Sequence, residues 1–201
     1  MSVLGLIQSS PSRPTDPVEI ARQVHEAVSR GFEAIPRAWG NRNADGLEGY
    51  VSSDYLARAR AVIDGQDDEF QVTCVEDDRL REVAVERPEE GATNVHAYLA
   101  FVARNWLEDL RTGEILSGSE DTLRGMVQRW TVVFEDGKGW VVHRVRSLWT
   151  GPAEPIEAGA FPGIDNGWYS RSRSPGAWRR WNGAKWKRPR QQPQAPPPDP
   201  S

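Results

Sequence analysis

The stretch that decides the fold runs from Thr122 to Trp149 and is TLRGMVQRWTVVFEDGKGWVVHRVRSLW. Apolar side chains alternate with polar ones along both of its halves, which is the two-residue period of an extended strand. Between the halves, residues 135–139 (EDGKG) supply glycines that tolerate the positive φ of a tight reversal. The stretch therefore predicts a long antiparallel hairpin with one apolar face, and other elements must cover that face.

Strict alternation also predicts which side chains of the return arm share a face. Trp140 and Val142 are expected on one face, and Val141, His143 and Val145 on the other.

Upstream of the hairpin the apolar period is helical. Residues Asp16–Glu19 combine an N-cap residue, a proline at the first helical position and a glutamate three residues after the cap, so a helix begins here. Pro36 is expected to bend or end this helix. After a short connecting segment, a further helix is predicted from Asp54 to Ile63, capped by Ser52 or Ser53.

The period then changes to that of strands. Phe70–Val75 and Leu80–Arg87 alternate, and Asp77-Asp78 is expected to form a turn between them. The apolar run Val95–Leu107 suits either a strand or a helix, and its position among strands favours a strand. Helices grouped before four or five antiparallel strands predict an α+β fold, with helices over one face of a curved sheet. Large rings fill the space under such helices, so a core position is expected for at least three of Trp39, Trp106, Trp130 and Trp140.

Charge is distributed unevenly along the 201 residues. Residues 151–201 hold eight Lys/Arg and four Asp/Glu, a net charge of +4, so the total of −4 leaves −8 for residues 1–150. The single cysteine, Cys74, excludes an internal disulfide and a paired-cysteine metal site. The first residues lack a basic, apolar signal pattern, and no apolar run has the length of a membrane helix. These features predict a cytoplasmic protein, with peripheral contact to a membrane as the alternative.

Short motifs within residues 17–149 carry a resemblance to a known fold. They are Ala38-Trp39 followed by Asn43-x-Asp45-x-Leu47, then Asn105-Trp106-Leu107-x-Asp109, and then Gln128-Arg129-Trp130-Thr131-Val132. This region resembles the nuclear transport factor two-like superfamily and, more narrowly, the Tim forty-four-type domain of the mitochondrial import motor and its bacterial relatives. The resemblance implies a cone-shaped antiparallel sheet covered by N-terminal helices. It also implies a cavity that serves catalysis, ligand binding or docking, and it makes a homodimer an option.

A second motif set lies near the C-terminus: Gly167-Trp168-Tyr169, Pro175-Gly176 and Arg179-x-Trp181-Asn182-Gly183-x-x-Trp186. It resembles a tryptophan-rich domain of unknown function that is common in actinobacterial proteins. Arg171-Ser172 and Asn182 stand where that pattern has acidic residues, so this copy is more basic. The predicted order along the chain is a flexible arm (1–15), a cone-type α+β domain (16–150), a linker (151–163), a Trp-rich module (164–187) and a disordered Pro-rich tail (188–201).

Catalytic candidates are few. His96 and His143, each with Tyr98 as a partner for acid–base work, are weak candidates, because isolated histidines on strands are commonly bystanders. The histidines are dispersed without metal-ligand spacing, so neither a metal site nor another cofactor is predicted.

The leading hypothesis is a non-enzymatic binding or scaffold protein that docks a protein partner through the cone and the basic Trp-rich module. An apolar small ligand in the cone is a further option. The alternatives are a small-molecule isomerase or dehydratase of the cone superfamily, and adsorption of the tail to an anionic membrane. Nucleic acid is the least favoured partner, because the body is acidic. The residues expected at the module's core or contact face are Trp168, Tyr169, Trp178, Arg179, Arg180, Trp181 and Trp186.

Overall fold

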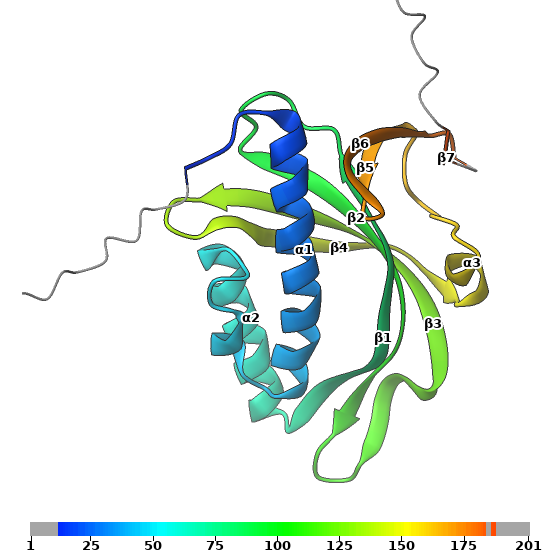
Figure 1. Ribbon diagram of the computed structural model, residues 1–201. Helices are drawn as coiled ribbons and strands as arrows, with labels where there is room; N and C mark the ends of the chain where they lie inside the picture. Colours follow the sequence, from blue (N-terminus) through cyan, green and yellow to red (C-terminus); the bar gives the residue numbers. More distant parts are fainter. Residues whose placement is uncertain (1–11, 184–185, 188–201) are drawn as a thin grey trace, which may run out of the picture.

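The computed structural model describes residues 12–183, 186 and 187 (Figure 1). Most of the N-terminal arm and the Pro-rich tail predicted from the sequence lie outside the described residues. Among those described, no helix has both the length and the apolar content needed to cross a membrane. The elements in chain order are α1 (Pro17–Gly40), η1 (Ala44–Leu47), α2 (Ser53–Asp68), β1 (Gln71–Glu86), β2 (Asn94–Asp109), β3 (Glu114–Glu135), β4 (Gly139–Pro152), α3 (Glu154–Glu157), β5 (Gly167–Arg171), β6 (Ser174–Trp181) and β7 (Trp186–Lys187).

The strands form one open antiparallel sheet of seven strands in the order β4-β3-β2-β1-β5-β6-β7. Helices α1 and α2 lie against one face of this curved sheet (Figure 1). The predicted α+β class, with N-terminal helices over an antiparallel sheet, is therefore confirmed. The strands β5, β6 and β7, which hold the Trp-rich motifs, continue the sheet from the edge of β1.

The hairpin Thr122–Trp149 is present as β3 and β4, with Glu135 paired to Gly139 at its end. Two extra residues on β4, His143 and Leu148, interrupt strict alternation. Val132 pairs with Val142 and Thr131 pairs with Arg144, so His143 is an extra residue in a β-bulge. The bulge returns Val145 to the face of Val142, where it packs against the core under the helices. The face predicted for Val145 was wrong for this reason.

The turn predicted at Asp77-Asp78 was also wrong. Strand β1 continues through these residues, and the register moves from Glu76↔Arg104 to Arg79↔Val102, which leaves one extra residue on β1. Asp77 takes a φ of 50°, the left-handed conformation that Asp tolerates better than most residues. A β-bulge has the same local sequence signature as a turn, and pairing along the whole of β2 keeps the strand continuous.

Helix α1 begins as predicted, with the Asp16 carboxylate accepting a hydrogen bond of 3.2 Å from the Glu19 amide. Pro36 does not end it, because the helix runs on to Gly40. Pro36 removes one backbone hydrogen bond, but Ile35 and Ala38 on either side of it are buried against the core and hold the helix in place.

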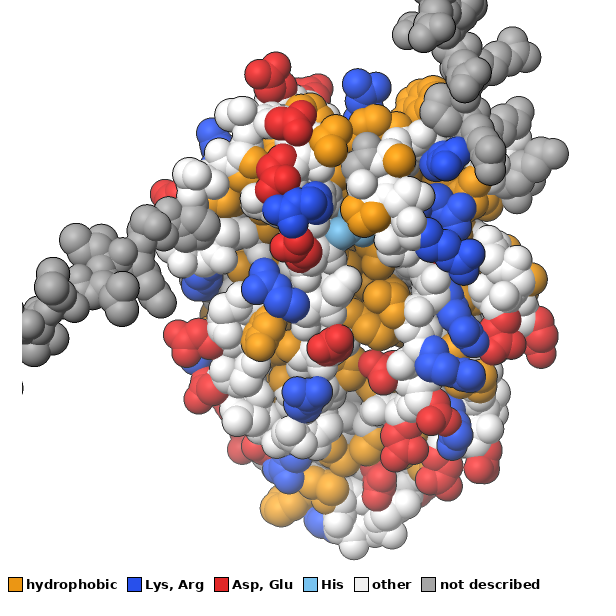
Figure 2. All heavy atoms as spheres, viewed as in Figure 1, with side chains coloured by type: hydrophobic (Ala, Val, Ile, Leu, Met, Phe, Trp, Pro, Cys, Tyr) orange, Lys and Arg blue, Asp and Glu red, His pale blue; other side chains and the backbone are white. Residues whose placement is uncertain are grey.

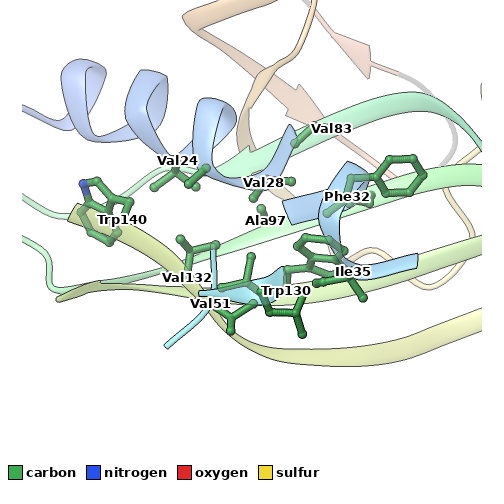
Figure 3. Close-up of a cluster of buried hydrophobic side chains, with 14 of the residues drawn as sticks. Val24, Val28, Phe32, Ile35, Val51, Val83, Ala97, Trp130, Val132 and Trp140 are labelled. Atoms are coloured by element: carbon green, nitrogen blue, oxygen red, sulfur yellow. The ribbon is translucent and has the colours of Figure 1, made fainter. Parts of the chain in front are cut away.

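Two apolar clusters hold the fold together. The larger lies between the helices and the sheet and includes the buried rings of Phe32, Phe101, Trp130 and Trp140. Figure 3 labels three of them, Phe32, Trp130 and Trp140. Trp106 is also buried, whereas Trp39 is half-buried at the edge of the cluster. Three of the four tryptophans predicted for the core are therefore buried.

The second cluster covers the opposite face of the sheet. Its body residues include Tyr98 and Val127, and Tyr169 and Trp181 of the C-terminal strands pack against them. Residues 151–163, expected to link the two parts, contribute α3 and bury Ile156 in this cluster. Residues that follow β4 in the chain therefore cover this face of the sheet.

Candidate binding cleft

A cleft of about 200 Å³ lies between the C-terminal half of α1, the start of α2 and the sheet. Apolar side chains are visible in the hollow beside α1, and Lys and Arg side chains flank it on the side of β1, β5 and β6 (Figure 2). Its lining is mostly aromatic and aliphatic, and it includes Phe32, Ile35, Trp39, Tyr55, Phe101 and Trp130. Concave, largely apolar sites with a few polar groups are the usual form of ligand-binding pockets.

The cleft lies where residues 32–39 of α1 face strands β1 to β4. Phe32 packs edge-on against Phe101, with ring centroids 5.1 Å apart, and this contact forms the floor. Trp130 is fixed by a hydrogen bond of 2.9 Å from its indole N–H to Gln128 Oε1. The walls are therefore held in place by the packing of these rings and by the hydrogen bond of the Trp130 indole.

Tyr55 is one of the polar residues that line the cleft, together with Asp78, Asn105 and Gln128. Burial raises the pKa of its phenol, and the charge of Arg58 and, to a smaller extent, a hydrogen bond from Trp39 oppose that effect. The phenol is therefore neutral at ordinary pH and can donate or accept a hydrogen bond inside the cleft.

A second pocket, of about 430 Å³, adjoins the cleft at the edge of β4 and is lined by Tyr55, Arg58, His143, Arg144 and Val145. Tyr55 and Val145 line both cavities, so the two share a wall. His143 Nδ1 lies 3.0 Å from Ser52 Oγ, and Arg58 Nη2 donates a 2.8 Å hydrogen bond to the His143 carbonyl. The bulge at His143 is thus fastened to the N-terminus of α2.

The structure separates the weak catalytic candidates. His96 and Tyr98 lie on the strand face away from α1, whereas His143 lies beside α2. His96 Nδ1 is 3.3 Å from Thr131 Oγ1, and burial lowers the pKa of the imidazole. Tyr98 is buried and packs edge-on against Tyr169 at 5.5 Å. Among the described residues, the ring of His96 is hydrogen-bonded to the Thr131 hydroxyl and that of His143 to the Ser52 hydroxyl.

The seven residues expected in the Trp-rich module have different environments. Tyr169 and Trp181 are buried, and Trp186 packs at 4.9 Å from Trp181. Trp178 packs at the margin of the larger cluster, with Arg87 over its ring. Trp168 and Arg180 are exposed, and Arg179 is half-buried. Trp168 and Arg180 are therefore the expected contact residues that present most surface.

Sequence reasoning did not identify Phe32, Tyr55 or Val145 as site residues. Each stands in an ordinary apolar or capping position, and only the packing of α1, α2 and β4 brings them to one cavity. The triplet His143-Arg144-Val145 carried a usable signal, because basic residues interrupt an apolar strand there. Over the described residues, no group of His, Cys, Asp and Glu is arranged to hold a metal ion.

Comparison with known proteins gives a fold relationship. No family model matches the chain, and no curated protein matches it in sequence. Among solved structures, the crystal structure of the intermembrane space region of the chloroplast protein ARC6 is similar, with a TM-score of 0.50 and 18% sequence identity. The match covers 63% of this chain and 95% of that chain. At this identity the likeness concerns the fold alone.

Proposed function

We propose that this protein is a non-enzymatic binding protein that docks a protein partner, taking an apolar side chain of the partner into the cleft beside α1. The observation that carries the proposal is the cleft itself, which is apolar, preformed and open to the surface. An apolar cavity of ~150 Å³ can hold a benzene molecule. A volume of about 200 Å³ therefore suits one aromatic or branched side chain.

The surroundings of the cleft favour a macromolecular partner. Lys and Arg side chains lie beyond the hollow on the side of β1, β5 and β6 (Figure 2). Exposed Trp168 adds an aromatic contact of the kind that is enriched at protein interfaces. A small cavity within a larger mixed surface is the arrangement expected where one anchor residue is surrounded by weaker contacts.

The test is site-specific photocrosslinking in cells that contain the full chain. A benzophenone amino acid replaces Asn105, an exposed residue that lines the cleft, or Val62, an exposed residue of α2 outside it. We expect a discrete crosslinked protein from position 105 and not from position 62. Adding Val75→Trp, which fills the cleft, should reduce that crosslink about fivefold while the unfolding transition is retained.

Two results would count against the proposal. One is the same set of products from both positions, which indicates non-specific contact. The other is a crosslink from position 105 that does not respond to Val75→Trp, because the partner then does not enter the cavity. Native mass spectrometry of the purified protein covers the case of an apolar small ligand, which would appear as a bound mass that Val75→Trp removes.

A further inference from the structure

Arg58 donates one hydrogen bond within the fold, but that contact leaves the positive charge of the pocket lined by Arg58, His143 and Arg144 without a counter-charge among the described residues. Arg58 and Arg144 are exposed, and neither forms an ion pair with a carboxylate among the described residues. They lie in the part of the chain, residues 1–150, that carries a net charge of −8. Unneutralised arginines gathered at one pocket of an acidic body create a local site for an anion.

The geometry of the pocket leaves donors available. Arg58 uses Nη2 for the His143 carbonyl, so its remaining guanidinium hydrogens are free to bind a second acceptor. Ser52 Oγ accepts a hydrogen bond of 3.1 Å from the Tyr55 amide, and its own hydrogen can be donated to His143 Nδ1. In that arrangement His143 Nε2 carries a proton and is also a donor.

The position of the pocket connects it to the cleft. Tyr55 and Val145 form the wall that the two cavities share, with apolar lining on one side and arginines on the other. Strand β4 lies at one edge of the sheet. Its pairing with the segment that precedes α2 is at Val142, which bridges to Val51. A segment that enters the cleft therefore has a basic pocket immediately beside its anchor.

We infer that the docked partner presents an acidic side chain next to its apolar anchor, and that Arg58, His143 and Arg144 bind this carboxylate. The inference rests on the proposed function, since it names the chemistry of the segment that occupies the cleft. An acidic–apolar segment is attracted to this pocket and repelled by the rest of the acidic body, so the pocket also fixes the direction in which the segment docks.

Two aromatic probes separate the contribution of the charge from that of the cleft. Anilinonaphthalene sulfonate carries an anionic group, and phenylnaphthylamine has the same rings without it. We expect the wild-type protein to bind the sulfonate more tightly, and Arg58→Gln or Arg144→Gln to weaken sulfonate binding about fivefold, the effect of losing one charge-assisted contact. Binding of phenylnaphthylamine should be unchanged in both variants.

Arg30→Gln is the matched control, because Arg30 is exposed on α1 and lines neither cavity. It removes the same charge and should leave the binding of both probes unchanged. If the Arg58 and Arg144 variants behave like Arg30→Gln, the inference is overturned while the cleft proposal stands. If Val75→Trp leaves phenylnaphthylamine binding intact, the cleft proposal itself fails.

A pair of capped dipeptides tests the peptide chemistry directly. Acetyl-Glu-Trp-amide and acetyl-Gln-Trp-amide differ only in the charge, and nuclear magnetic resonance titration reports binding through the amides of β4. We expect the wild type to bind the glutamate peptide at least threefold more tightly than the glutamine peptide. The Arg144→Gln variant should bind the two peptides with equal affinity. Equal affinities in the wild type would refute the inference. Inorganic phosphate that saturates the pocket without competing with the peptide would assign the arginines to a free anion instead.

Discussion

His25 is a buried histidine that joins α1 to the C-terminal strands. Its Nε2 lies 3.1 Å from the Ser170 carbonyl oxygen and 3.2 Å from Ser170 Oγ, and the ring is only 6% exposed. Burial lowers the pKa of the imidazole, and the hydrogen bond to the Ser170 carbonyl and the charge of Glu82 oppose this to a smaller extent. The ring is therefore held neutral in the folded protein.

This environment predicts a pH dependence of the free energy of unfolding. The unfolded chain takes up a proton on His25 as the pH falls through about 6.5, whereas the folded chain does so only at lower pH. The stability that the neutral ring contributes is complete above that pH and is lost as the pH falls below it. The free energy of unfolding of the wild type, measured with urea, should be lower at about pH 5.5 than at about pH 7.5. His96 contributes to this drop in the same direction, because the pKa of its imidazole is also lowered by burial.

His25→Gln should reduce this drop, because glutamine keeps an N–H donor for the Ser170 carbonyl and does not titrate. The same two-pH comparison on the variant supplies the check. An unchanged drop would show that His25 is not the group responsible.

At the scale of the elements, the packing of α1 on the hairpin depends on a glycine. A Cβ placed on Gly31 would lie 2.9 Å from Val142 Cγ2 and 3.1 Å from Trp130 Cζ3, closer than side chains normally approach. Helix and sheet therefore meet here at a distance that only glycine allows.

Gly31→Ala should destabilise the protein by up to roughly 2 kcal/mol, since overpacking of ~1–3 kcal/mol is partly offset by a gain in helix propensity of about 1 kcal/mol. Gly65→Ala in α2 is the control, because a Cβ there meets nothing within 4 Å and the change should stabilise by up to ~1 kcal/mol. Chemical denaturation of both variants measures the difference. Stabilisation by both substitutions would contradict the close packing.

At the scale of the whole molecule, the C-terminal strands share a core with the body. Trp181 and Tyr169 are each 2% exposed and belong to the same cluster as Tyr98 and Val127. The buried Glu82 of β1 also accepts hydrogen bonds from Arg171 and from the Ser172 hydroxyl, the latter at 2.7 Å. Apolar and polar contacts both join the two parts into one structure.

The full chain should therefore unfold in one cooperative transition. Trp181→Ala should lower its stability by about 3 kcal/mol or more, the usual cost of removing a buried tryptophan. Differential scanning calorimetry and tryptophan fluorescence should report coincident transitions for the wild type and the variant. Two separate transitions, with only the smaller one moved by the substitution, would show that the C-terminal strands fold independently.

Much of the fold, but little of the candidate site, could be predicted from the sequence. Local signals were sufficient for the N-cap at Asp16, the reversal near Gly137 and the alternation of β3, because each depends on residues close together in the chain. They were insufficient at Asp77, where a bulge resembles a turn, and at His143, where a bulge interrupts an alternation that looks regular. Both bulges become evident only when the partner strand is known. The cleft could not be predicted for the same reason, since its walls come from α1, α2 and four strands.

Helix and strand periods and capping residues are properties of short segments, and they sufficed to predict helices over an antiparallel sheet in this protein. Three features needed the tertiary structure: the continuation of the sheet into β5–β7, the volume left beneath the end of α1, and the gathering of Arg58, His143 and Arg144 at one pocket. Each of these depends on contacts between residues far apart in the chain. Such contacts are fixed by how the packed surfaces fit together, and no short stretch of the sequence encodes that fit.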